Sequence, residues 1–583
     1  MNKHPLVYEL QKLKDSSKEA VAHSDLSTDD AFKRYLHIER YVETVLRDIV
    51  QKASQVPHPV LLLICGNVGD GKSHLLSCLN NDVELRTCYQ SFSVHNDATE
   101  SFSPDENCIQ TLTHILEPFA DDNIDKGHCC KQILAINLGT LSNFLEERKD
   151  RFSKLKHFVE NQGILELAQI KEDTYREGSI FQYINFTNYH FFELTEEGIK
   201  PTIFQKLLDR LALQEDSNPV FAAYQRLLAY EWSDRCPVRY NYEFLFDPNH
   251  RAVLADLLVK AIIKEKQIIS FRHLLNFVHD MLVPHQFSYE DLEQYGNKIK
   301  SFKFKTRVRY YTPYYLFEHP TLSKLFATLT KLDPCADRDE RLDELAIQLF
   351  TSTSPIEVFK QHVQHITFYL RKIVEALNSD QDALFKLFIR LAFFQSRGEL
   401  FTDPYFQAFT KALYAFNRKD ALGLRSTNEI VKAAVEKWNG STHGKNNVML
   451  PSASKRYKYR VFKNISLQSV LPTPDQKANI AVLHQFFPQL RFEFRSPVGQ
   501  DTQQIDVDYA LYVLLCKINQ GYRPNKLDRN NYIIFVRFVD LLINTGNSGS
   551  TESMLYVDEI NLGGPLDYSF SQNEYGEYVF EKL

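Results

Sequence analysis

Apolar residues in the first third of the chain follow a pattern that predicts strands alternating with helices. Val60–Cys65 is a continuous apolar run of strand length, and Tyr89–His95, Gln132–Asn137 and Phe181–Phe186 also predict strands. Between them, Ile109–Phe119 carries apolar residues at helical spacing. Strands that alternate with helices are typical of a parallel sheet covered by helices. We therefore predict an α/β domain in this part of the chain.

Helical spacing dominates on both sides of this domain. Residues 32–50 predict a helix that ends before two prolines. Downstream, Arg251–Lys266 predicts a strong helix, and a second one begins at Ser270 and stops at Pro284. Residues 356–438 are predominantly helical, with aromatic and leucine side chains at core spacing. The chain is therefore expected to be helical over much of its length.

The C-terminal part of the chain changes character. Arg491–Phe494 and Met554–Val557 are strand-like, whereas residues 507–518 and 530–543 are helix-like. Asp528 is the expected N-cap of the second helix. A separate α+β domain is the simplest interpretation of this mixture.

Residues 66–73, GNVGDGKS, match the G-x-x-x-x-G-K-S pattern of a phosphate-binding loop and lie between a predicted strand and a predicted helix. Glycines let successive N–H groups point at an anion, and the helix N-terminus adds partial positive charge. Lys72 would neutralise the β- and γ-phosphates, and the Ser73 hydroxyl would hold Mg²⁺. The alternative is a glycine-rich turn that binds nothing. The predicted ATP site consists of Gly66, Asn67, Val68, Gly69, Asp70, Gly71, Lys72, Ser73 and His74.

ATP hydrolysis also needs an acid that orients Mg²⁺ and a group that positions the attacking water. Four apolar residues followed by Asp-Glu, the usual source of the acid, do not occur here. The nearest substitutes are Asp97, expected in the metal shell, and Glu100. Alternatively, these residues only cap a strand and start a helix. Asn137, at the end of another predicted strand, is similar to the γ-phosphate sensor of AAA+ ATPases.

Arg272 is a further candidate for nucleotide contact. It follows a polar cap in the first turn of the helix that begins near Ser270. This arrangement is similar to the second sensor of AAA+ proteins, an arginine that reaches the nucleotide from a helical lid. An arginine early in a helix is equally often a solvated residue.

Composition limits the class of protein. The chain has 583 residues, 44% hydrophobic and 24% charged, which is typical of a globular protein of several domains. The net charge of −6 argues against a broadly basic nucleic-acid binder. No run approaches the length of a membrane span, and no signal-peptide core is present near residue 1, so a cytoplasmic protein is expected. The nine cysteines form no C-x-x-C pair. The adjacent His128, Cys129 and Cys130 could ligate a metal only together with distant partners, and the alternative is a partly buried loop.

Two basic and aromatic segments are candidates for contact with DNA. In both, cations alternate with apolar residues, so on a strand they would share one face and could track a phosphate backbone. The alternative is a solvated edge strand protected by charge. The first set of cations is Lys303, Lys305, Arg307 and Arg309, and the second is Arg456, Lys458 and Arg460. We find no nuclease motif of the H-N-H or H-K-D kind.

Several segments beyond the phosphate loop resemble a known family. They are SSKEAV (16–21), YLHIER (35–40), HNDATESFSPDEN (95–107), ILAINLGTLSNF (133–144), SFRHLLNF (270–277) and GYRPNKLDRNNYIIFVRF (521–538). With them the chain resembles DptF, a component of the DptF–DptG–DptH restriction system associated with DNA phosphorothioate modification. The resemblance implies an ATPase subunit, acting with DptG-like and DptH-like partners in a complex that attacks DNA lacking the modification. The competing interpretation is an AAA+-like protein-remodelling or signalling ATPase with no direct DNA role.

The resulting fold prediction is an α/β P-loop NTPase core, AAA+-like, with a helical lid, then a helical region and a C-terminal α+β domain. The expected segments are an N-terminal helical segment (1–55), the ATPase domain (56–250), the lid with a basic strand (251–330), the helical domain (331–440) and the α+β domain (441–583).

Overall fold

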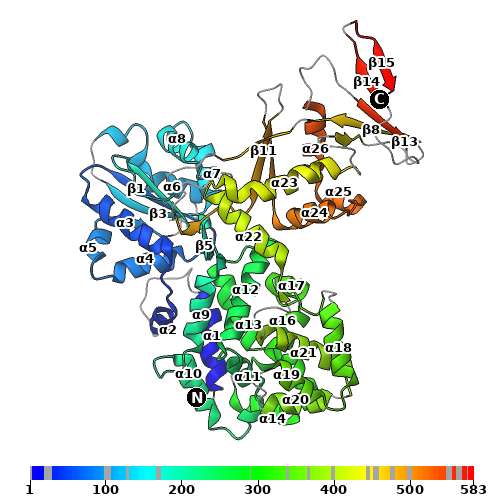
Figure 1. Cartoon of the computed structure of the whole chain (residues 1–583). Coiled ribbons are helices and arrows are strands. Elements are labelled where there is room, and N and C mark those ends of the chain that lie inside the picture. The colour runs from blue at the N-terminus through cyan, green and yellow to red at the C-terminus, as the bar shows by residue number, and fades with distance from the viewer. Residues whose placement is uncertain are drawn as a thin grey trace. The chain divides into compact units, whose positions relative to one another are not determined.

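Figure 1 shows the computed structural model of the chain, which divides into two compact units. The first comprises residues 1–193, 201–402 and 484–486, and the second residues 194–200, 403–483 and 487–583. The structure describes residues 3–18, 29–96, 107–126, 130–165, 172–288, 291–336, 340–363, 368–377, 379–395, 401–440, 447–450, 459–465, 467–472, 480–495, 502–545, 555–559, 568–573 and 575–582. No helix in these ranges is both long and apolar enough to cross a membrane.

The first unit is built on a four-stranded parallel sheet, in the order β2-β3-β1-β4. The strands are β1 (Val60–Cys65), β2 (Ser93–His95), β3 (Lys131–Ile136) and β4 (Phe181–Asn185). β1 is central and buried along its whole length. The α/β core predicted from strand and helix alternation is therefore confirmed.

Alternate side chains of β1 serve two separate cores, one on each face of the sheet. Leu61 and Leu63 belong to one core, together with residues of α6 (Cys108–Ile115), α7 (Leu138–Glu147) and α8 (Ser153–Gln162). Leu62 and Ile64 belong to the other, with residues of α3 (Tyr41–Gln55) and α4 (Lys72–Asn81). Helices therefore cover both faces, as burial of a parallel sheet requires.

The single helix predicted over residues 32–50 is wrong in one respect. The structure has α2 (Asp29–Leu36) and α3, joined by an extended connector, residues 37–40. Arg40 has φ −112° and ψ 151°, which is extended backbone. Helical periodicity continues across this break because both helices bury one face, so the periodicity could not reveal the connector.

The strand predicted over Tyr89–His95 is also only partly correct. Tyr89 lies in the short helix α5 (Arg86–Gln90), and only Ser93–His95 forms a strand. Tyr89 N–H donates to the Leu85 carbonyl, and its ring packs against the same core as α3 and α4. A helical turn buries this ring as well as a strand would. In such a short segment, burial of the side chain outweighs intrinsic propensity in determining the secondary structure.

The remainder of the first unit is mostly helical, although it also contains most of the strand β5 (Tyr189–Thr195). An N-terminal helix, α1 (Pro5–Lys18), packs with α10 (Pro219–Leu228) and α13 (Phe271–Leu282). The other helices are α9 (Thr202–Ala212), α10 (Pro219–Leu228), α11 (Pro237–Phe244), α12 (Pro248–Glu265), α13 (Phe271–Leu282), α14 (Leu292–Ser301), α15 (Phe304–Arg307), α16 (Thr312–Glu318), α17 (Lys324–Lys331), α18 (Glu340–Thr351), α19 (Pro355–His362), α20 (Phe368–Leu377) and α21 (Gln381–Gln395). The predicted helices at Arg251–Lys266 and Ser270–Pro284 correspond to α12 and α13.

The basic strand predicted at residues 302–310 is wrong. Phe304–Arg307 forms α15, and Val308–Tyr310 a 3₁₀ turn. The rings of Phe302 and Tyr310 pack against each other and against Phe287, which a turn permits and an extended strand would not. The four cations consequently share no strand face.

Unit two contains the remaining described helices and two antiparallel sheets. The helices are α22 (Pro404–Asn417), α23 (Ala421–Lys437), α24 (Tyr509–Asn519), α25 (Lys526–Asn531) and α26 (Ile533–Thr545). One sheet has the order β12-β11-β9 and the other β15-β14-β13-β8-β7. These strands are β7 (Asn447–Met449), β8 (Tyr459–Asn464), β9 (Gln468–Val470), β11 (Leu490–Arg495), β12 (Thr502–Val507), β13 (Leu555–Glu559), β14 (Tyr568–Gln572) and β15 (Tyr578–Lys582).

Two sequence predictions in this unit need comment. Asp528 is not an N-cap, because it lies inside α25. Asn525 is the N-cap of α25, and Asp528, three residues later, completes the capping box. Of the second basic segment, Arg460 lies on β8, opposite Asp558 of β13. Arg456 and Lys458 lie outside the described residues.

Candidate functional site

The candidate phosphate loop lies between β1 and α4, at the carboxyl end of the central strand. Cys65 ends β1, and Lys72 begins α4. Gly69 and Gly71 both have φ of 87°, a backbone conformation that other residues rarely adopt. Gly71 is also the N-cap of α4. The backbone therefore favours glycine at Gly71, which is a fixed position of the motif, and also at Gly69, which the motif leaves open.

Several backbone N–H groups of the loop are available to a ligand. Among the described residues, no partner is found for the backbone N–H groups of Gly69, Gly71 and Ser73. The first N–H groups of a helix have no partner inside it, and they point out along its axis. The N–H groups of Gly71 and Ser73 at the start of α4, the Gly69 N–H in the loop before it and the positive end of the helix together suit a phosphate group.

Lys72 bridges the start of the loop. Its Nζ donates to the carbonyl oxygens of Gly66 and Asn67, both at 2.8 Å. The ammonium group is therefore held over the loop by two neutral acceptors. An anion in the loop would be a stronger partner for it than either carbonyl.

Asp70 is the acidic residue of the loop. Its Oδ2 accepts a hydrogen bond of 2.6 Å from Asn67 N–H, which is thereby not available to a ligand. Burial raises the pKa of Asp70 above its usual value, although the Asn67 N–H and the Lys72 charge act in the opposite direction. Of the nine predicted loop residues, Asn67 and Asp70 thus have a role inside the loop itself.

Two arginines contact the loop from different segments. Arg40, on the connector, donates from Nη2 to the Asp70 carbonyl at 3.1 Å. Arg272, in the first turn of α13, donates its backbone N–H to the Gly69 carbonyl at 3.4 Å. The buried Nε of Arg272 has no partner within the described residues. The structure thus brings the predicted Arg272 to the loop, and adds Arg40, for which the sequence offers no signal beyond its charge.

The ends of the other strands contribute polar groups at the same edge of the sheet. Asn137 directly follows β3. β3 is the neighbour of β1 in the sheet, and neighbouring strands lie about 5 Å apart. Asn137 Oδ1 accepts from Thr140 N–H at 2.7 Å and so caps α7, which leaves the amide N–H₂ as its donor. Asp97 and Glu100 come after β2, one strand further out, and lie outside the described residues.

Asp173 is a buried carboxylate near this edge that sequence analysis missed. Its Oδ2 accepts hydrogen bonds from Asn185 N–H, at the end of β4, and from Gln485 Nε2, both at 3.0 Å. Its Oδ1 is buried without a hydrogen-bond partner in the described residues. Burial raises the pKa of Asp173 to about 6. A lone Asp in an irregular segment carries no motif, so only the fold reveals it.

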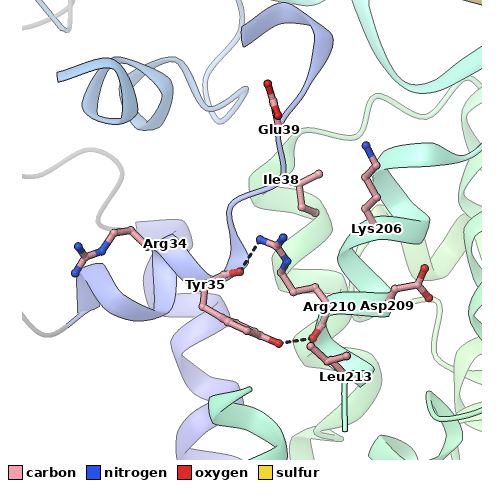
Figure 2. Close-up of a pocket in the computed structure, with 8 residues that line it drawn as sticks. All are labelled: Arg34, Tyr35, Ile38, Glu39, Lys206, Asp209, Arg210 and Leu213. Atoms are coloured by element: carbon pink, nitrogen blue, oxygen red, sulfur yellow. Dashed lines mark hydrogen bonds between the residues drawn. The ribbon is translucent and has the colours of Figure 1, made fainter. Parts of the chain in front are cut away.

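An open hollow of about 760 Å³ lies beside the connector (Figure 2). Tyr35 OH donates to the Arg210 carbonyl at 2.7 Å, and Arg210 Nη1 donates back to the Tyr35 carbonyl at 2.9 Å. Figure 2 shows these two bonds joining the end of α2 to α9. The lining residues are Arg34, Tyr35, Ile38, Glu39, Lys206, Asp209, Arg210 and Leu213.

One further pattern has a structural explanation. Asn525–Asp528, NKLD, matches the N-K-x-D pattern of guanine-reading loops. In the structure Asn525 Oδ1 accepts from Asp528 N–H at 3.0 Å, and Asp528 Oδ2 accepts from Asn525 N–H at 2.9 Å. These residues form the capping box of α25, which accounts for the pattern without a base.

Comparison with models of protein families finds none that matches the chain, and comparison with curated proteins finds no matching sequence.

Proposed function

We propose that the chain is an ATP-binding and ATP-hydrolysing subunit, with an AAA+-like P-loop core, of a bacterial DNA restriction complex that acts on DNA lacking phosphorothioate modification. DptG-like and DptH-like subunits would be its partners. The observation that carries the nucleotide part is the loop between β1 and α4, which has the Lys72 ammonium at its start and three N–H groups that find no partner among the described residues. The restriction role rests on the resemblance of several segments to DptF.

Each group in this site has a task in ATP turnover. The loop N–H groups would hold the phosphates, and Lys72 would move from the Gly66 and Asn67 carbonyls onto the β- and γ-phosphate oxygens. Ser73 would hold Mg²⁺, which when bound neutralises charge on the phosphates. Arg272 fits a phosphate contact from α13, because its buried Nε lacks a partner among the described residues. The amide of Asn137 would position the γ-phosphate or the attacking water.

Isothermal titration of the wild-type chain and Lys72→Ala with ATP tests the nucleotide site. We expect binding by the wild type and at least a hundredfold weaker binding by the variant, since a charge-assisted contact to phosphate contributes about 3 kcal/mol. Circular dichroism and the thermal midpoint should not change, because Lys72 is only half-buried. Equal affinities would exclude the loop as the site. GTP, titrated in parallel, should bind more weakly than ATP.

The second candidate is a protein-remodelling or signalling ATPase. It is favoured by the structure of residues 303–310, which form no basic strand, and by the net charge of −6. Retention of the chain on duplex DNA, with and without ATP at moderate salt, separates the two candidates. ATP-stimulated retention supports a restriction subunit, whereas none at any salt, even with the partner subunits, supports the second candidate.

A further inference from the structure

Three side chains that suit a transition metal converge beside the phosphate loop. His37 Nδ1 lies 3.0 Å from His74 Nε2, and Cys78 Sγ lies 3.8 Å from the former and 3.7 Å from the latter. All three residues are half-buried. They are the one group of metal-ligating type found among the described residues.

The three distances are those of one face of a zinc tetrahedron. Zinc binds imidazole nitrogen at about 2.0–2.1 Å and thiolate sulfur at about 2.3 Å. Tetrahedral angles then separate two nitrogens by about 3.3 Å, and nitrogen from sulfur by about 3.6 Å. The observed separations differ from these by only a few tenths of an ångström. The ligand atoms would need almost no movement to bind an ion.

A second group orients the first histidine for this role. His37 Nε2 lies 3.2 Å from Oε2 of Glu43, whose side chain is 1% exposed. The other oxygen, Oε1, accepts from Arg47 Nη2 at 2.9 Å, so the carboxylate is fixed in place. A carboxylate this close to the outer ring nitrogen favours a proton on Nε2, and this tautomer leaves the inner nitrogen free to ligate. Here that inner nitrogen is Nδ1, which faces His74 and Cys78.

The sequence positions explain how the fold assembles the group. His74 and Cys78 are four residues apart on α4 and therefore share one face of that helix. His37 comes from the connector, three residues before the Arg40 that contacts the loop. An ion bound here would cross-link the connector to the helix that follows the phosphate loop.

We propose that His37, His74 and Cys78 form a Zn²⁺ site with water in the fourth position. Binding releases to solvent the one proton that the His37 and Cys78 side chains hold between them, which leaves a neutral imidazole and a thiolate as ligands, and no bond is oxidised or reduced. Two nitrogens and one thiolate suit borderline ions such as zinc rather than Mg²⁺ or Ca²⁺. The site adjoins the proposed ATP site, since His74 is also one of the nine predicted loop residues. Its three ligand atoms are side-chain atoms and are not among the loop donors, so zinc binding does not depend on ATP.

The test uses the full chain, stripped with a chelator and then dialysed against zinc. The wild type should retain one zinc per chain by elemental mass spectrometry, and zinc should raise its thermal midpoint. Co²⁺ in place of zinc should give a thiolate charge-transfer band and the strong visible bands of a tetrahedral site. Cys78→Ser should abolish the charge-transfer band, and His74→Gln should lower zinc affinity at least tenfold. The control variants Cys88→Ser and His58→Gln change half-buried residues outside the group and should behave as the wild type.

Thermal midpoints of the chelator-treated variants separate loss of a ligand from loss of the fold, since the metal-free variants should unfold where the metal-free wild type does. Glu43→Gln provides an independent measurement, because it keeps all three ligands and should weaken zinc binding about 10–100-fold. Wild-type chain that retains no zinc, or a cobalt spectrum that Cys78→Ser leaves unchanged, would overturn the proposal. The three side chains would then be a hydrogen-bonded histidine–cysteine group only.

Discussion

Arg40 Nη2 donates to the backbone carbonyl of Asp70 at 3.1 Å, which fastens the connector between α2 and α3 to the candidate phosphate loop. The same nitrogen lies 3.1 Å from the point where a side chain at Gly71 would begin. The Arg40 guanidinium also lies over the Phe186 ring, at 5.6 Å from its centroid. A residue twenty positions before β1 thus helps to set the shape of the loop.

Removal of the Arg40 side chain should loosen the loop and weaken nucleotide binding. For Arg40→Ala we expect about tenfold weaker ATP binding, because one hydrogen bond from a charged group contributes about 1.5 kcal/mol. Arg40→Lys keeps the charge but not the planar donor group, so its affinity should lie between those of the wild type and Arg40→Ala. Isothermal titration measures both variants. Unchanged affinity in Arg40→Ala would mean that the loop keeps its shape without the connector.

Asn137 has a capping role and a proposed catalytic role, which two substitutions separate. Asn137→Asp keeps an N-cap oxygen for α7 and removes the amide donors, so the fold should stay stable while ATP turnover falls. Asn137→Ala should also cost about 1 kcal/mol of stability. Thermal unfolding and steady-state phosphate release, measured on both variants, give the comparison. Wild-type turnover in Asn137→Asp would leave only the capping role.

Asp173 should make stability depend on pH. Its folded-state pKa of about 6 exceeds the usual value, so the protonated form is favoured in the folded chain. The resulting stability is fully present below the unfolded pKa of about 4 and is lost as the pH rises through about 6. Between about pH 5 and about pH 7.5 the free energy of unfolding of the wild type should fall by about 1 kcal/mol relative to that of Asp173→Asn. Urea unfolding of both proteins at the two pH values measures the difference, and parallel curves would contradict it.

Arg307 should act as a structural residue rather than as a DNA contact. Its side chain is 2% exposed, and its Nε and Nη2 both donate to the Phe302 carbonyl, at 3.0 and 2.5 Å. Arg307→Ser should therefore lower the free energy of unfolding by about 2 kcal/mol, because it removes buried charged donors. The exposed Lys303, changed to Ser, is the control and should alter stability by less than about 0.5 kcal/mol.

The salt dependence of DNA binding by the assembled complex tests directly whether Arg307 contacts DNA. Removing one cation that binds a phosphate should flatten the slope of log K against log salt by about 0.9. We expect Arg307→Ser to leave that slope unchanged, since a buried guanidinium cannot reach a phosphate backbone. A flatter slope in folded Arg307→Ser would show instead that Arg307 contacts the DNA.

Local patterns were sufficient for the elements that form from contiguous residues. The apolar run Val60–Cys65 predicted β1, and the spacing of glycines after it predicted a loop that the structure builds with two left-handed glycines. α12 and α13 also match their predicted positions closely. Strand length, helical spacing and caps are properties of neighbouring residues, so the sequence alone carries them.

Tertiary packing decided the elements whose local pattern fits two structures. Alternating cations at 303–309 fit a strand, but packing of Phe302 and Tyr310 with Phe287 makes a turn and buries Arg307. Continuous helical spacing over residues 32–50 hid the connector, whose course is set by contacts with the loop. In both cases, long-range burial outweighs the local preference.

The sequence by itself determined that a glycine-rich loop follows a buried strand, because both lie within one short segment. Only the tertiary structure brought Arg40 and Arg272 to the loop, buried Asp173 near the strand ends, and placed His37 beside His74 and Cys78. These residues come from segments far apart in the sequence. Their proximity depends on how the helices pack on the sheet, and no spacing along the chain encodes that.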